Sequence, residues 1–143
     1  MSVKQISVFV ENKKGGLYEV TSVLNKASVD IRALSIADTT DYGILRLIVS
    51  DYKKALETLK AEGIIASVTD VLGIEVSDTP GGFSEAVKIL SDADIAVEYA
   101  YAFITRHEGK ACVIIRVEDN AKAANILGKA GISLIEADKA FSK

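Results

Sequence analysis

The sequence predicts an α+β protein in which the order strand, helix, strand, strand, helix, strand occurs twice. The first indication is a pair of glycines at the end of an alternating apolar segment, Gly15-Gly16, which recurs 66 residues later as Gly81-Gly82. The second is a helix-opening aspartate, Asp51, which recurs 68 residues later as Asp119. The third is the length of 143 residues, which suits two modules that are each small for an independent core.

The first repeat is predicted from apolar spacing. Apolar residues alternate before the first glycine pair, as in a half-buried strand, and then recur every three or four residues, as on one helix face. Asp51 can cap a second helix, and Gly63 can end it. The predicted elements are a strand at 5–11, a helix at 17–27, strands at 30–38 and 43–50, a second helix between Asp51 and Gly63, and a strand at 64–71.

The second repeat follows the same order from Leu72 onward. The predicted elements are a strand at 72–76, a helix at 83–93, strands at 95–105 and 110–117, a helix opened by Asp119, and a strand at 133–137. Each repeat is the split βαβ arrangement of ferredoxin-like folds, an antiparallel sheet with both helices on one face. We therefore predict one domain at 1–71 and a second at 72–143. The uncovered sheet faces are apolar enough to predict interfaces.

Composition disfavours several kinds of partner. The net charge is −3 and the pI is about 5.2, with basic residues scattered, which argues against binding a nucleic-acid backbone. The aromatic stripe Tyr99, Tyr101 and Phe103 is better explained by packing than by RNA stacking, because such modules carry their aromatics on the first and third strands. No apolar run is long enough for a membrane helix. A single cysteine and the lack of a signal-peptide pattern predict a cytoplasmic protein.

Catalytic chemistry is not evident in the sequence. His107 is the only histidine and falls in a polar turn, so a zinc site of the usual spacing cannot be assembled. Cys112 lies within an apolar strand and suits core packing. Asp92 and Asp94 fall at a predicted helix end, where turn and capping roles are common. We predict that the protein is not an enzyme and needs no cofactor or metal.

The two glycine corners are the candidate binding positions. Each leads from a strand into a helix, whose first amides lack helical acceptors and whose dipole favours an anion. Each corner could therefore hold a carboxylate or phosphate. The alternative is that the glycines only make a tight turn between packed elements.

These features resemble a tandem pair of ACT domains, the regulatory modules that bind amino acids in biosynthetic enzymes. The resemblance covers the whole chain and depends on the corners at 10–17 and 76–83 and on the segment 29–32. It implies a ligand site between paired domains, where a corner faces the start of a neighbour's second strand. Carried onto this sequence, the binding positions are Asn12, Gly15, Gly16, Leu17, Asp30, Ile31, Asp78, Gly81, Gly82 and Phe83.

Two departures from the family pattern distinguish the repeats, since Lys14 replaces the usual proline and Ala96 replaces the second-strand polar residue. If the halves pair with each other, residues 78–83 would face 30–32, and residues 12–17 would face 96–98. The resemblance implies an amino-acid-binding regulatory protein without catalytic activity. It also implies a homodimer and a partner enzyme of amino-acid metabolism. The alternative is an oligomerisation module with a vestigial pocket; a nucleic-acid-binding pair is a more distant option.

Overall fold

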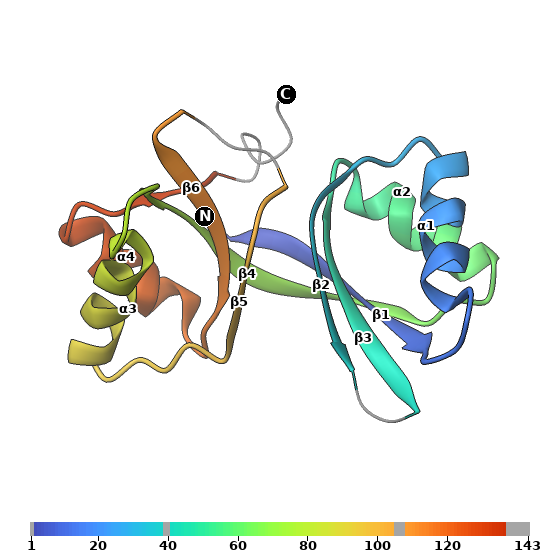
Figure 1. The fold of residues 1–143 in the computed structure, drawn as a ribbon, viewed down its shortest axis with the longest axis horizontal. Helices are drawn as coiled ribbons and strands as arrows, with labels where there is room; N and C mark the ends of the chain where they lie inside the picture. The colour runs from blue at the N-terminus through green and yellow to red at the C-terminus, as the bar shows by residue number, and fades with distance from the viewer. Residues whose placement is uncertain (1, 39–40, 105–107, 137–143) are drawn as a thin grey trace. The chain divides into compact units, whose positions relative to one another are not determined.

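The computed structural model describes residues 2–38, 41–104 and 108–136. It divides into two compact units, Lys4–Thr69 and a unit formed by Asp70–Lys143 with Met1–Val3. Each unit is an antiparallel sheet with helices packed on one face (Figure 1). The predicted α+β class and the two ferredoxin-like repeats are confirmed.

The unit Lys4–Thr69 has the strand order β2-β3-β1-β4, and its pairs β1–β3 and β2–β3 are antiparallel. Its elements are β1 (Val3–Glu11), α1 (Gly16–Lys26), β2 (Ile31–Asp38), β3 (Tyr42–Val49), α2 (Tyr52–Ala61) and the first part of β4 (Ala66–Ser77). All lie within a few residues of their predicted bounds. The side chain of Asp51 caps α2 by accepting from the Lys54 amide at 3.1 Å, as predicted.

In the unit Asp70–Lys143, β4 pairs with β6 on one side and β7 on the other, and β5 pairs with β6. The further elements are α3 (Gly82–Asp92), β5 (Tyr99–Ala102), β6 (Lys110–Arg116), α4 (Asn120–Lys129) and β7 (Ser133–Leu134). The side chain of Asp119 accepts from the Lys122 amide at 3.0 Å, which repeats the cap formed by Asp51. The repeats therefore match in their capping as well as in their order.

Equivalent residues of the two repeats fill equivalent cores. Leu24 of α1 and Leu59 of α2 are fully buried in the core of the first unit. Leu90 and Leu127 are fully buried in the core of the second. These four positions are related by the repeat steps of 66 and 68 residues, so the repeat read from the sequence is a repeat of core packing.

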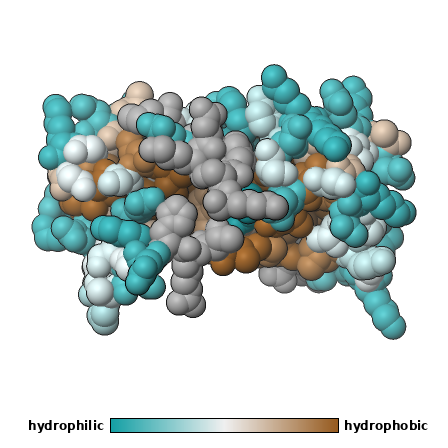
Figure 2. All heavy atoms as spheres, turned by 90° about the horizontal axis from the view of Figure 1, so that it is seen from above, coloured by the Kyte–Doolittle hydropathy of each residue, from teal (hydrophilic) through white to brown (hydrophobic). Residues whose placement is uncertain are grey.

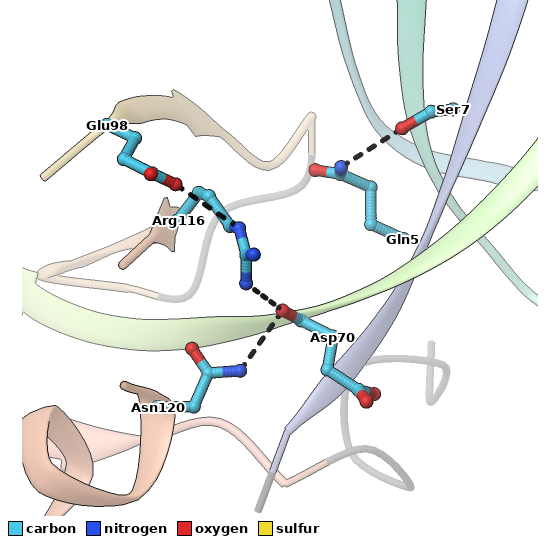
Figure 3. A network of polar contacts seen from close by, with 6 residues as sticks. All are labelled: Gln5, Ser7, Asp70, Glu98, Arg116 and Asn120. Atoms are coloured by element: carbon cyan, nitrogen blue, oxygen red, sulfur yellow. Dashed lines mark hydrogen bonds and ion pairs between the residues drawn. The ribbon is translucent and has the colours of Figure 1, made fainter. Parts of the chain in front are cut away.

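Strand β4 differs from the prediction of two strands that meet between residues 71 and 72. It is one continuous strand of 12 residues that serves as the last strand of the first repeat and the first strand of the second. Its main chain is held where the repeats meet, because the Asp70 carbonyl accepts from Arg116 Nη1 at 3.2 Å and from Asn120 Nδ2 at 3.0 Å (Figure 3). Arg116 Nε also lies 3.3 Å from a carboxylate oxygen of Glu98 (Figure 3).

Two predicted strands are shorter in the structure. Strand β5 begins at Tyr99 and not at residue 95, because Ile95 and Val97 pack against the core without forming regular ladder pairs. The last strand ends at Leu134, and its predicted end at residue 137 lies outside the described residues. A pattern of apolar alternation therefore marked core-facing residues correctly but overestimated the paired length.

Hydrophobic residues reach the surface of both units (Figure 2). In the first unit Phe9 and Tyr42 are about half exposed, with ring centroids 5.7 Å apart. Leu34 and Ile36 of β2 are also exposed, by 43% and 44%. In the second unit the stripe Tyr99, Tyr101 and Phe103 is half-buried, as a packing role requires.

Candidate functional site

The two glycines of the first corner are required for different reasons. Gly15 has a φ of +87° and precedes α1 in the left-handed region, which side chains disfavour. Gly16 has a φ in the usual range, but a Cβ there would lie only 2.6 Å from the Glu11 carbonyl oxygen. The first glycine therefore sets the turn, and the second lets α1 start against the end of β1.

The second corner repeats this construction. Gly81 has a φ of +88°. A Cβ on Gly82 would lie 2.0 Å from the Ser77 carbonyl oxygen, which is closer than at the first corner. The glycine pair is therefore fully explained by local packing, whether or not a ligand binds.

The amides at the helix starts fall into two groups. The Gly16 amide donates to the Lys13 carbonyl at 3.2 Å, and the Gly82 amide donates to the Thr79 carbonyl at 3.0 Å. Both are thus used within their own turns. The following two amides at each corner have no acceptor among the described residues; they belong to Leu17, Tyr18, Phe83 and Ser84. The donors open to a ligand are therefore one and two residues beyond the second glycine.

The polar residues Asn12 and Asp78 hold equivalent places at the corners. The Asn12 amide donates to the Asp41 carbonyl at 3.0 Å, and the Asp78 amide donates to the Gly109 carbonyl at 3.2 Å. Each main chain is thereby fixed to the adjoining hairpin. Both side chains lie in exposed positions. The role of these two residues in binding stays a prediction.

Asp30 lies just before β2 and is already engaged within the chain. Its amide donates to Ser50 Oγ at 3.0 Å, and its carboxylate pairs with Arg32 Nη1 at 3.0 Å. Arg32 is buried, whereas the Asp30 side chain is 58% exposed. Ladder pairing with β3 shifts between Ile31 and Ala33, so a bulge there turns the strand start.

Within one unit the corner and the start of β2 lie at opposite ends of the sheet. Glu11, at the corner, pairs with Tyr42, whereas Ile31 pairs with Val49 at the other end of β3. Seven residues of strand separate these ends by about 23 Å. One unit therefore cannot place Asp30 beside its own corner, and a site that joins them takes two modules. Which modules face each other stays a prediction.

A groove of about 470 Å³ lies beside the first corner, between the end of β1, the start of α1 and the loop after α2. Apolar groups from Phe9, Ile64 and Ile65 line it together with the charged residues Glu11, Lys13 and Glu19. Lys13 Nζ lies 3.0 Å from Glu11, and this hydrogen bond and charge raise the pKa of the lysine. The sequence did not predict this groove, and the only sign of it there is the apolar pair Ile64-Ile65 next to a helix end.

Two of the groups considered as catalytic candidates from the sequence, Cys112 and Asp92, lie in the described residues. Cys112 is buried, and burial, aided by the charge of Glu75, raises the pKa of its thiol. Asp92 pairs with Lys88 at 2.6 Å on the surface of α3. No group of three or more His, Cys, Asp or Glu side chains in the described ranges could hold a metal. His107 lies outside these ranges.

The comparison with protein families decides the identity of this fold. The model of the ACT domain pair matches residues 1–143. The chain belongs to the ACT domain pair family. A search of curated proteins found no match.

Among solved structures, this ACT domain pair is similar to protein BT0572 from Bacteroides thetaiotaomicron, with 37% identity and a TM-score of 0.93, over 100% of this chain and 98% of that one. It also shares its fold with the ligand-free regulatory subunit of aspartate kinase from Thermus thermophilus, with 17% identity and a TM-score of 0.66, over 89% and 91% of the chains. The regulatory subunit of aspartate kinase from Thermus flavus has 17% identity and a TM-score of 0.61, over 90% of this chain and 92% of that one. No helix in the described part of this chain is long and apolar enough to cross a membrane.

Proposed function

We propose that the protein binds a small amino acid between paired ACT modules and regulates another protein, without catalysing a reaction itself. The observation that carries this proposal is the pair of helix starts at the corners. The amides of Leu17 and Tyr18 in one repeat, and of Phe83 and Ser84 in the other, have no acceptor among the described residues. Membership of the ACT domain pair family supports it.

The groups near each corner suit a zwitterion. The open amides can donate to an α-carboxylate, and the helix dipole adds to that attraction. The side-chain oxygen of Asn12 or Asp78 can accept from an α-ammonium group. Asp30 can serve the same purpose from the neighbouring module, because a carboxylate paired with one arginine nitrogen still has acceptor capacity. Ile31, Leu17 and Phe83 would then supply apolar contacts to the ligand's side chain.

The modules of this proposal are 1–71 and 72–143, and the assembly is a homodimer. Because the proposal includes no catalytic centre, the ligand would act by changing the assembly of the protein or its affinity for a partner. The coupling free energy between the two binding events would be roughly 1–3 kcal/mol. The aspartate kinase regulatory subunits of similar fold favour a partner enzyme of amino-acid metabolism, in the cytoplasm. The second candidate, an oligomerisation module with a vestigial pocket, is favoured by the purely structural need for both glycine pairs.

A thermal-shift screen against the twenty amino acids tests this function. We expect one or a few of them to raise the melting temperature, because a ligand at 100 times its dissociation constant adds about 2.7 kcal/mol. Asp78→Ala should weaken the shift. Asp92→Ala removes the same carboxylate from an exposed surface pair on α3 and should leave the shift unchanged. A dimer that responds to none of the twenty would favour the oligomerisation module instead.

A further inference from the structure

The groove beside the first corner owes its shape to the end of β1. Strand β1 runs to Glu11, whereas β4 begins only at Ala66. The Phe9 amide donates to the Ile65 carbonyl at 3.2 Å, and shortly before Ile65 the chain leaves α2 at Gly63, with a φ of +72°. The last residues of β1 therefore run past the start of β4, and the groove of about 470 Å³ lies beside them.

Three large hydrophobic side chains at this groove are exposed. Phe9, Tyr42 and Ile65 all line it, and their exposed fractions are 55%, 46% and 71%. The rings of Phe9 and Tyr42 lie with their centroids 5.7 Å apart. Side chains this exposed contribute little to a core, and a cluster of exposed hydrophobic side chains is a common mark of a binding site.

The second repeat shows that the fold does not require hydrophobic residues at these places. The repeat steps of 66 and 68 residues relate the three to polar residues, Glu75, Lys110 and Ser133. Strand pairing supports this equivalence, because Tyr42 lies opposite Glu11 in the first unit and Lys110 lies opposite Ser77 in the second. Both units form the same elements with the same helix caps. The hydrophobic side chains at the first groove therefore serve something other than the fold.

The groove suits a small molecule that carries charges of both signs. Its volume of about 470 Å³ lies within the roughly 300–1,000 Å³ of ordinary ligand pockets. A stable protein interface instead takes about 800 Å² from each partner, far more than three side chains supply. Glu11, Lys13 and Glu19 line the same groove, so a carboxylate and an ammonium group would each find an opposite charge there.

We propose that the first corner selects an amino acid with a large hydrophobic side chain, which lies in this groove against Phe9, Tyr42 and Ile65. The inference rests on the proposed function and names the ligand class of that function at one corner. Gly16 and Val20 line the groove, so the first turns of α1 form one of its walls, next to the open amides. A carboxylate bound by those amides leaves the side chain of the ligand at the groove. Even an aromatic amino acid is a small molecule beside a groove of about 470 Å³.

Calorimetric titration of the full chain tests this selectivity. L-phenylalanine or L-leucine should bind at least about 10-fold more tightly than L-alanine, because burying a large hydrophobic side chain adds to the affinity. The variant Phe9→Glu, Tyr42→Lys, Ile65→Ser introduces the residues of the second repeat without changing the net charge, and it should lose most of this preference. Ile104→Ser removes the same side chain as Ile65→Ser from a place in the second unit that is 60% exposed, and it should keep the preference.

The outcomes of the titration distinguish this inference from the proposed function. If L-alanine, L-serine or glycine binds as tightly as L-phenylalanine and L-leucine, the large hydrophobic class is wrong and the amino-acid function stands. If none of these amino acids binds, and none of the other natural amino acids does, both are wrong. A preference that survives in the triple variant would also overturn the role of the groove.

Methyl NMR of the unaltered chain locates the ligand's side chain and needs no variant. With ¹³C-labelled isoleucine methyl groups, L-phenylalanine or L-leucine should shift the signal of Ile65 and leave that of Ile104 in place. Binding of either amino acid without a shift at Ile65 would put the side chain outside the groove and overturn the proposal.

Discussion

Replacing Leu24 or Leu90 with alanine is expected to lower the free energy of unfolding by about 2–5 kcal/mol in each case. Both side chains are fully buried, at equivalent places in the cores of the two units. Each substitution removes apolar contacts and leaves a cavity that a close-packed core refills only in part. Urea unfolding followed by circular dichroism measures the loss.

Leu17→Ala is the matched control, because it removes the same atoms from a side chain that is 43% exposed on α1. We expect a loss of under about 1 kcal/mol there. Native-state hydrogen exchange then tests the proposed domains 1–71 and 72–143, since Leu24→Ala should lower protection chiefly in the first and Leu90→Ala chiefly in the second. Equal loss of protection over the whole chain would contradict two separable modules.

Gly82→Ala is expected to cost about 3 kcal/mol of stability, and Gly16→Ala somewhat less. The added Cβ would meet the Ser77 carbonyl oxygen at 2.0 Å in the first case and the Glu11 carbonyl oxygen at 2.6 Å in the second. These oxygens belong to the main chain, so the steric clash can be relieved only by moving the end of a strand or the start of a helix. Thermal or urea unfolding of the purified variants gives the comparison.

Gly128→Ala provides the control for both substitutions. Gly128 lies inside α4 with nothing within 4 Å of its would-be Cβ, so alanine should raise stability by about 0.5–1 kcal/mol through better helix propensity. Should Gly82→Ala prove neutral while Gly128→Ala is stabilising, the close approach of α3 to the end of β4 would not be what requires glycine there.

Local rules were enough to predict the helices and their starts. Asp51 and Asp119 were predictable as helix caps, because an aspartate just before an amphipathic segment commonly accepts a hydrogen bond from an amide of the first helical turn. The apolar spacing indicated which face of each helix is buried. Strand pairing is non-local, so the sequence did not reveal that β4 runs unbroken through residues 71 and 72 or that β5 is only four residues long.

The structure confirms that each glycine corner leads from a strand into a helix, and the role of the corners in binding stays a prediction. The glycine corners are where the sequence put them, yet the amides of Gly16 and Gly82 serve their own turns, and the open amides belong to the next two residues. The register shift between Ile31 and Ala33 is set by pairing with β3 rather than by local sequence, so the sequence did not predict it. The groove beside Ile65 is lined by residues from segments that are far apart in the sequence, so local sequence rules did not predict it.

The most direct test of amino-acid binding is a titration of ¹⁵N-labelled protein with the amino acid that gives the greatest thermal stabilisation. We expect the amide signals of Leu17 and Tyr18, or of Phe83 and Ser84, to shift as the ligand is added. The amides of Gly16 and Gly82 should change less, because they remain bonded to Lys13 and Thr79. Binding that leaves all four open amides unshifted would contradict the claim that these helix starts hold the ligand's carboxylate.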